Sequence, residues 1–347
     1  MISSQNELSI QDVCFLFLVL RGPEIQDMRI LSEYSSYSTQ AHDDLLAQWE
    51  AAQGEGGPLE LDLTPVSFMD PYGMVALVLF LNHLPETMRP VHLRMSGFDW
   101  RNPEASSSTS SNAASYLTRM NFWESVEDVI DAPPEKIPLR AKGLIDKNVL
   151  LEVTIFRTHD AISEMLHQTG EILQNLGYTV TARGHVLEVL SELCSNVLLH
   201  AEAPFGGVAA MQTYRNRGGT RYVVISIGDA GIGVRHSLAH NSALAGRLES
   251  DAQALGVAVQ AGTSRFGVGG HGGGLTRVLE IARRYGGQVA IRSGSGALAY
   301  SGNKNERRAF DAAATQGTQL RISLPEASLC ANPQADLLAP EGEVKGE

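Results

Sequence analysis

The spacing of hydrophobic and polar positions predicts different arrangements of secondary structure in the two halves of the chain. In the first half, apolar runs typical of strands alternate with stretches typical of helices. The predicted strands are 13–20, 59–63 and 91–95, and the predicted helices lie near 41–52, 71–83 and 113–120. Asp70 is a suitable N-cap and Pro71 is tolerated at the first helical position, so the second helix has a defined start. This alternation indicates a small α/β domain.

The second half mixes helices with strands that pair as hairpins. Predicted strands are 149–156, 208–214, 222–227, 288–293 and 318–324, and predicted helices are 160–176, 182–201 and 275–285. Gly177 suits the position that ends a helix, and the sequence at 215–219 is typical of a turn between two strands. The pattern predicts an α/β sandwich with a mixed, mostly antiparallel sheet.

Two polar or proline-rich segments divide the chain. The run of Ser and Thr at 106–112 is typical of a flexible loop, and the segment 131–138 is typical of an interdomain linker. The last residues are acidic and show no periodicity. We therefore expect an α/β domain at 1–130, a linker at 131–145, a second domain at 146–326 and a disordered tail at 327–347.

Composition narrows the class of protein. The formal net charge of −12 argues against non-specific nucleic-acid binding, which depends on Lys and Arg. Three widely separated cysteines suggest neither a disulfide framework nor a zinc site, so a reduced, cytoplasmic protein is expected. The apolar run at 13–20 is too short to cross a bilayer and follows acidic rather than basic residues. We read it as a buried strand and expect no membrane segment.

Three polar side chains share one face of the predicted helix at 182–201. Glu192, Asn196 and His200 follow each other at intervals of four residues. A carboxylate, an amide and an imidazole placed in this way offer oxygen ligands and a base to one small volume. A solvated polar face is an equally good interpretation of this helix taken alone.

A second motif lies where an apolar strand ends in Asp229, with Gly231 and Gly233 close behind it. A carboxylate at a strand end can accept a hydrogen bond from a buried amine, and glycines let the backbone come close to a ligand. An ordinary strand and turn would give the same local sequence.

A third motif is the glycine-rich run at 267–274, directly before the predicted helix that begins at Leu275. It offers unhindered backbone N–H groups at a helix N-terminus, which is a favourable arrangement for binding phosphate. A disordered linker is the alternative, although linkers rarely lead into a well-patterned helix.

The order of these motifs resembles the GHKL ATPase superfamily, which includes DNA gyrase, the ninety-kilodalton heat-shock chaperones, mismatch-repair ATPases, histidine kinases and anti-sigma serine kinases. The resemblance covers about half of the chain and implies the Bergerat ATP-binding fold with ATP and Mg²⁺ as cofactors. It rests on Glu192-xxx-Asn196-xxx-His200, Asp229-x-Gly231-x-Gly233, Gly270-x-Gly272-x-Gly274-Leu275 and Gly317-Thr318.

The resemblance also implies roles for these residues. Asn196 would hold Mg²⁺, and Glu192 would be the general base or would orient water. Asp229 would accept from the adenine amine, and Thr318 would lie behind the adenine. The implied role of Gly231 and Gly233 is to allow the adenine-side turn, and that of Gly270, Gly272 and Gly274 is to cradle the phosphates. The role of His200 stays open.

The segment 234–269 would be the lid, read as a loop that orders when nucleotide binds. The chain has no P-loop motif, and no Lys lies between Lys147 and Lys304. Positive charge near the phosphates would therefore come from Arg265, Arg277 or the metal.

The chain lacks the paired helices that carry the phosphorylated histidine in histidine kinases. Only one helix precedes the one with Glu192, so the arrangement looks more like an anti-sigma kinase. A sensor histidine kinase would instead carry phosphate on His159 or His167.

The first half resembles STAS domains, the antagonists of anti-sigma factors, in the strand–turn–helix at 59–77 and in the helix at 114–123. That family usually has Ser or Thr after the Asp, where its kinase phosphorylates it. This chain has Pro71 and Tyr72, so phosphoregulation at that place is doubtful. A generic α/β domain is the alternative.

Two functions remain open at this point. The chain is either an anti-sigma-kinase-like regulator that acts on a protein partner, with Ser/Thr phosphotransfer as an option, or a nucleotide-gated switch with slow or no hydrolysis inside a larger assembly. Whether it is an enzyme is undecided. Nucleic acid and membrane are not expected as partners, and a homodimer is compatible because dimers are frequent in the superfamily.

Overall fold

The structure, a computed structural model, describes residues 28–52, 58–96, 113–131, 148–216, 218–260 and 273–330. The strand expected at 13–20, the polar run at 106–112, nearly all of the expected linker and most of the expected tail lie outside these residues.

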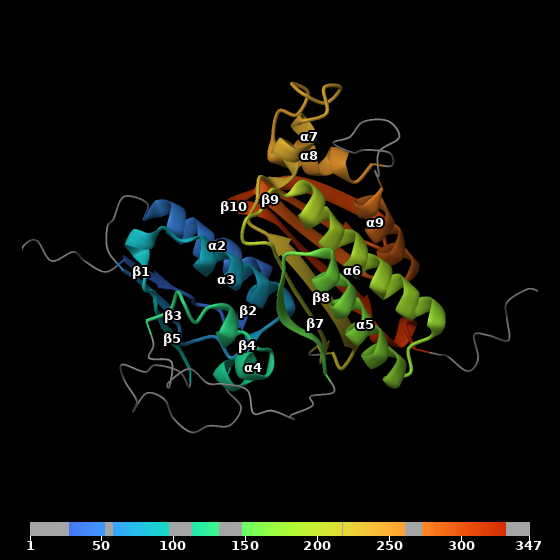
Figure 1. The fold of residues 1–347 in the computed structure, drawn as a ribbon, viewed down its shortest axis with the longest axis horizontal. Helices are drawn as coiled ribbons and strands as arrows, with labels where there is room; N and C mark the ends of the chain where they lie inside the picture. Colours follow the sequence, from blue (N-terminus) through green and yellow to red (C-terminus); the bar gives the residue numbers. More distant parts are fainter. Residues whose placement is uncertain are drawn as a thin grey trace, which may run out of the picture.

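The second half of the chain builds a five-stranded sheet in the order β6-β7-β8-β10-β9 (Figure 1). Every neighbouring pair in it is antiparallel, which confirms the predicted fold class. The strands are β6 (Val149–Phe156), β7 (Gly207–Arg215), β8 (Arg221–Asp229), β9 (Gln288–Ser301) and β10 (Glu306–Pro325).

Three helices cover one face of this sheet, and their bounds agree with the predicted ones to within about two residues. They are α5 (His159–Asn175), α6 (Val180–His200) and α9 (Gly274–Arg284) (Figure 1). Thr158 and Thr179 cap α5 and α6 by accepting from backbone N–H groups. Gly177, with φ of 77°, follows α5 in the left-handed conformation expected of it.

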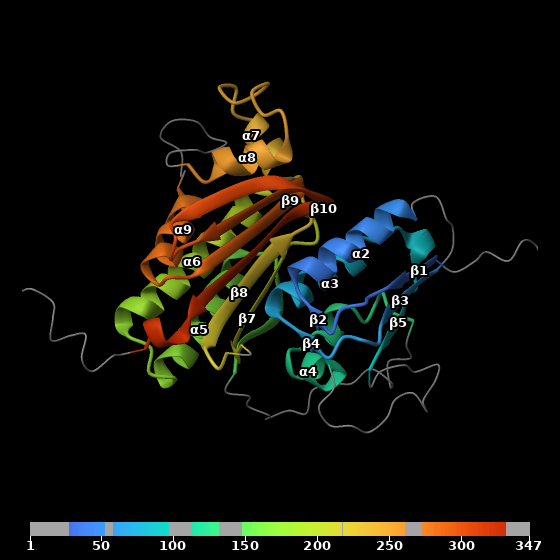
Figure 2. The same cartoon turned by 180° about the vertical axis from the view of Figure 1, so that it is seen from behind.

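The segment expected to be a lid loop contains two helices, and the loop prediction is wrong there. They are α7 (Gly233–Ala239) and α8 (Asp251–Ala258), at one end of the sheet (Figure 2). Leu238, Leu248 and Ala254 form a small apolar core between them. The Asp251 carboxylate accepts from Ser295 N at 2.9 Å and from its Oγ at 3.0 Å, which ties α8 to β9.

Strands β9 and β10 are longer than predicted. The sequence pattern ends one strand near 293 and begins the next at 318, whereas the two strands pair from Ser301↔Glu306 to Gln288↔Ser323. The register shifts between 311 and 318. Glycines and small residues there look like a loop in the sequence, but they lie at irregularities inside a continuous hairpin.

The first half builds a separate three-stranded parallel sheet of β1 (Met28–Leu31), β3 (Leu59–Leu63) and β5 (His92–Met95). Its helices α2 (Thr39–Ala51), α3 (Pro71–His83) and α4 (Ala113–Arg119) agree with the prediction. The sequence missed β1 and the two-residue strands β2 (Ser36–Tyr37) and β4 (Phe68–Met69). Short 3₁₀ helices complete the fold at η1 (Glu86–Met88), η2 (Trp123–Ser125) and η4 (Glu326–Ser328).

Helix α3, with α2 beside it, packs against the face of the five-stranded sheet opposite to α5, α6 and α9 (Figure 2). It is buried along nearly its whole length, as expected for a helix that is apolar all round. A Cβ on Gly228 of β8 would lie 2.8 Å from Leu79 Cδ1, so this glycine permits the close approach of α3. One apolar cluster therefore joins the two halves and includes Val153 and Val208.

Polar contacts reinforce this interface. Asp70 caps α3 by accepting from Gly73 N at 2.9 Å, and its other oxygen forms an ion pair with Arg321 of β10 at 2.7 Å. The hydroxyl of Tyr72 donates to Gln319 Oε1 at 3.0 Å. The two halves thus share both an apolar core and buried polar partners.

Candidate functional site

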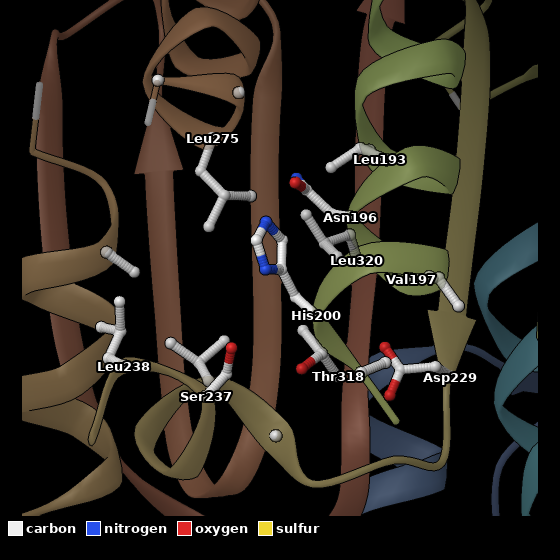
Figure 3. A pocket seen from close by; sticks show the side chains of 16 residues that line it. Leu193, Asn196, Val197, His200, Asp229, Ser237, Leu238, Leu275, Thr318 and Leu320 are labelled. Carbon is white, nitrogen blue, oxygen red and sulfur yellow. The ribbon is translucent and has the colours of Figure 1, made fainter. Parts of the chain in front are cut away.

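A pocket of about 120 Å³ lies between α6, α7, the start of α9 and the strands β8 and β10 (Figure 3). Seven of the eleven predicted site residues line it: Asn196, His200, Asp229, Gly233, Gly274, Leu275 and Thr318. Elements far apart in the sequence thus bring the predicted residues to one place.

One end of the pocket is formed by Asp229, the last residue of β8, and by Thr318, its partner on β10 (Figure 3). The Asp229 carboxyl is 4% exposed, and its Oδ1 accepts from Gly231 N at 2.8 Å. Burial raises the pKa of Asp229 to about 6, although backbone N–H groups of Gly231 and Thr318 oppose the rise. This end therefore offers a buried acceptor that is ionised at neutral pH.

Gly231 and Gly233, which follow Asp229, are needed for different physical reasons. A Cβ on Gly231 would lie 1.9 Å from Ala201 O, so this residue lets the turn pass under the end of α6. Gly231 does not itself line the pocket. Gly233 lines the pocket and has φ of 74°, a conformation that favours glycine.

The opposite end is formed where α6 meets the first turn of α9. A Cβ on Gly274 would lie 2.7 Å from Glu192 Oε2 and 3.3 Å from Asn196 Nδ2. Asn196 lines the pocket, and the exposed Glu192 lies beside it without lining it. A helix N-terminus carries partial positive charge, so this end combines oxygen ligands with a site favourable to an anion.

The middle of the pocket is mostly apolar. The imidazole of His200 projects into it between Asn196 and Asp229, and Leu275 faces it from α9 (Figure 3). Leu193, Val197, Leu238 and Leu320 complete the apolar lining. A flat apolar group would therefore find contacts on more than one side.

Arg277, one of the two arginines considered for the phosphates, does not line the pocket. Its guanidinium donates to Glu188 of α6 through Nε at 2.6 Å and through Nη2 at 3.1 Å. These hydrogen bonds raise the pKa of Arg277. They also connect α9 to α6. Arg265, Gly270 and Gly272 lie outside the described residues.

Sequence reasoning missed the contribution of α7 to the pocket. Val234, Ser237 and Leu238 line it, and Val234 N donates to Ser293 Oγ at 2.8 Å. Ser293 Oγ also donates to Gly317 O at 2.9 Å, so α7 is held to the sheet beside Asp229. The apolar spacing of 234 and 238 was the available signal, but the surrounding small residues obscured it.

No group of three or more His, Cys, Asp or Glu residues gathers in the part of the chain that the structure describes. No helix within that part is both long and apolar enough to cross a bilayer. The pocket presents a buried acceptor at one end and an amide and a helix N-terminus at the other, with the Glu192 carboxylate beside that second end. Such a site suits an elongated ligand with an amine head and an anionic tail.

Residues 181–328 match the sequence model of the family described as histidine kinase-, DNA gyrase B-, and HSP90-like ATPase, so these residues form a GHKL ATPase domain. Among solved structures, one similar chain is the histidine kinase domain from Erythrobacter litoralis EL346 blue-light activated histidine kinase. It is 11% identical, with 66% of this chain and 80% of that chain covered and a TM-score of 0.26. No curated protein matches the chain.

Proposed function

We propose that the GHKL domain binds ATP with Mg²⁺ in the pocket between Asp229 and Asn196, and that nucleotide binding controls a protein partner. The observation that carries the proposal is the pairing of a buried carboxyl at one end of the pocket with Asn196 and the start of α9 at the other. This arrangement occurs inside residues that match an ATPase family.

The adenine would occupy the end near Asp229. Its exocyclic amine has two N–H donors, and the Asp229 carboxylate is an acceptor shielded from water. Leu193, Val197 and Leu320 would contact the faces of the ring. Thr318 would lie behind the ring, as the resemblance to GHKL ATPases implies.

The phosphates would occupy the end near α9. The amide oxygen of Asn196 is a hard oxygen ligand of the kind that Mg²⁺ prefers, and the Glu192 carboxylate lies nearby, so the residues present fit this ion. When bound with nucleotide, Mg²⁺ neutralises phosphate charge. Glu192 would accept a proton from the attacking nucleophile or orient it.

The size of the pocket sets a condition on binding. Its volume of about 120 Å³ is below the ~300–1,000 Å³ usual for ligand sites. His200 projects into the space between the two ends (Figure 3). We therefore expect the imidazole, and α7 with it, to move when nucleotide enters.

Calorimetric titration of Mg-ATP into the full chain tests the proposal. Wild type should bind, and Asp229→Asn should bind at least ~10-fold more weakly, a loss of about 1.4 kcal/mol, because an amide is a poorer partner for the adenine amine. Asp311→Asn is the matched control, since Asp311 is exposed on β10 and does not line the pocket. Absence of binding by wild type would refute the proposal, and equal binding by Asp229→Asn would refute the role of Asp229.

The kind of control exerted on the partner is a finer proposal. Among the described residues from 148 onward, α5 is the one helix before α6, which favours an anti-sigma-kinase-like regulator. The parallel β1-β3-β5 sheet with its helices supports a STAS-like first half. The rival is a switch that binds nucleotide without turnover. ADP release that depends on Glu192 would favour the kinase or ATPase, whereas acid-labile phosphate on His159 or His167 would favour a histidine kinase.

A further inference from the structure

A second pocket, of about 330 Å³, lies between the two halves of the chain. Helices α2 and α3 form one side of it, and Ala230 with the segment 314–319 of β10 forms the other. Its volume reaches the lower end of the ~300–1,000 Å³ range of ligand sites. None of its lining residues belongs to the nucleotide pocket.

The buried end of this pocket contains His42, whose side chain is 1% exposed. Tyr37, which is also fully buried, hydrogen-bonds to His42 Nδ1 at 3.0 Å. The other ring nitrogen, Nε2, is buried and has no hydrogen-bond partner within the described part of the chain. A buried polar atom without a partner costs free energy, so this nitrogen calls for a partner from outside the protein.

The protonation state of His42 follows from its surroundings. Burial, together with the nearby Arg292 guanidinium, lowers the pKa of His42 to about 3, so the ring is neutral. Burial also raises the pKa of Tyr37, so its hydroxyl keeps its hydrogen and can donate to Nδ1. In the tautomer in which Tyr37 donates to Nδ1, the Nε2 atom carries the hydrogen and can donate to an acceptor.

Aromatic side chains form the wall beside His42. Trp49 and Phe80 meet edge to face with ring centroids 5.6 Å apart, and His42 and Phe80 lie at 6.4 Å. Leu46 and Leu79 add buried apolar surface. This lining suits a flat aromatic ring.

Charges on both sides restrict the net charge of an occupant. Glu50 lies at the exposed rim and would repel an anion. Arg292, near His42, is 3% exposed and is paired with Asp43 at 3.0 Å. A cation at the buried end would be repelled by Arg292. Since Glu50 repels anions at the rim, a molecule that fills the pocket should carry no net charge.

We propose that this pocket binds a small uncharged aromatic molecule whose carbonyl or amide oxygen accepts a hydrogen bond from His42 Nε2, and that its occupancy changes the affinity of the neighbouring nucleotide pocket. The second part rests on the proposed function; the first does not.

The coupling follows from a shared turn. Ala230 lines this pocket, while the preceding residue, Asp229, lines the nucleotide pocket. Gln316 Nε2 donates to Ala230 O at 2.9 Å and also lines this pocket. A ligand against Ala230 and Gln316 therefore contacts the backbone that positions Asp229.

Three probes of nearly identical shape test the ligand class: benzamide, benzoate and benzamidine, which are neutral, anionic and cationic. Each is titrated into the full chain without nucleotide and followed by ligand-observed NMR. Benzamide should bind with a dissociation constant of about 1 mM or tighter, as suits a ligand of this size, and the two charged probes at least ~10-fold more weakly. No binding of benzamide, or equal binding of a charged probe, would overturn the proposal.

Matched variants locate the binding. His42→Phe and Tyr37→Phe both remove the Tyr37–His42 hydrogen bond, but only His42→Phe removes Nε2. Binding should fall at least ~10-fold in His42→Phe and be retained in Tyr37→Phe. Ala314→Trp should block the pocket, while Ala309→Trp, at an exposed place on the same strand, should not.

Benzamide binding that persists in Ala314→Trp would overturn the location even if His42→Phe failed to fold. For the coupling, saturating benzamide should change the affinity for Mg-ATP at least ~3-fold in wild type and in Ala309→Trp, but not in Ala314→Trp. An unchanged affinity in wild type would overturn the coupling. If wild type bound benzamide but not ATP, the proposed function would fail while the aromatic site stood.

Discussion

The two faces of the five-stranded sheet are covered by helices in opposite ways. On one face, a pocket lined by Asn196, Asp229 and Gly274 lies between α6, α7 and the start of α9. On the other, α3 lies directly on β8 and is buried over nearly its whole length. Both faces rely on a glycine for close approach, Gly274 on the first and Gly228 on the second.

The atoms nearest to the two glycines show how tightly each face is packed. At Gly274 the nearest atom is the end of the flexible, exposed Glu192 side chain, whereas Gly228 meets the buried Leu79 and the backbone of Thr318. The first face therefore has an exposed carboxylate, Glu192, beside the pocket, where it can make room for a ligand. Where α3 crosses β8 the other face is closely packed, and Tyr72 and Asp70 of α3 are paired there with residues of β10.

Breaking the buried ion pair on the fixed face should have the largest effect. Arg321→Leu leaves Asp70, whose side chain is 4% exposed, as an unpaired charge, and should lower the free energy of unfolding by about 3 kcal/mol. Chemical denaturation measures it. Arg308→Leu, at an exposed site on the same strand, is the control, and Asp70→Asn with Arg321→Leu should recover part of the loss. A loss below ~1 kcal/mol in the single variant would show that the pair is dispensable.

The pH dependence of stability tests the buried carboxyl of the pocket face. The pKa of Asp229 is raised to about 6, so its contribution to stability is full at low pH and is lost as the pH rises through 6. The stability of wild type relative to Asp229→Asn should therefore fall by about 2 kcal/mol between pH 4.5 and 7.5. Denaturation curves across this range measure it, and a flat difference would mean an ordinary pKa for Asp229.

Adding one methyl group to each face compares the glycines directly. Gly228→Ala should cost about 1–3 kcal/mol of stability, because Leu79 and backbone must shift. Gly274→Ala should cost less than ~1 kcal/mol, because Glu192 can rotate away, yet it should weaken nucleotide binding. Thermal unfolding measures the stability of both variants, and calorimetry measures their affinity for nucleotide. A larger loss of stability in Gly274→Ala than in Gly228→Ala would contradict the contrast.

The smallest effect is expected for Arg277→Ala. The Arg277–Glu188 pair is 40% and 36% exposed, so its loss should cost about 0.2–1 kcal/mol. Affinity for Mg-ATP should stay within ~2-fold of wild type, because Arg277 does not line the pocket. Glu188→Gln, which removes the charge of the other partner, is the matched variant and should give a similar result. A tenfold loss of affinity would restore Arg277 as a phosphate ligand.

The sequence was most informative where the spacing of apolar residues and the residues that cap a helix indicate the same element. Helix α3 begins where Asp70 and Pro71 predict, and α6 and α9 follow their apolar spacing. It was least informative between 234 and 260, where small residues hide the two short helices α7 and α8. The core that stabilises these helices is tertiary and leaves only a weak periodic signal.

The same limit applies to the candidate site. Spacing placed Glu192, Asn196 and His200 on one helix face, but spacing alone does not reveal that Gly231 serves the packing against Ala201. The commitment of Arg277 to Glu188 depends on how α9 lies beside α6. The roles of the predicted residues in binding stay predictions until the titrations above are done.

The burial of α3 also bears on how the protein is handled and processed in a cell. Residues 148–330 released from the rest of the chain would uncover Val153, Val208 and Ala210 on a broad apolar surface of the sheet. A surface of that kind promotes self-association, so the ATPase domain produced alone should aggregate. A protease cut between the two halves should leave them together, and the cleaved protein should elute as one particle until denaturant separates them.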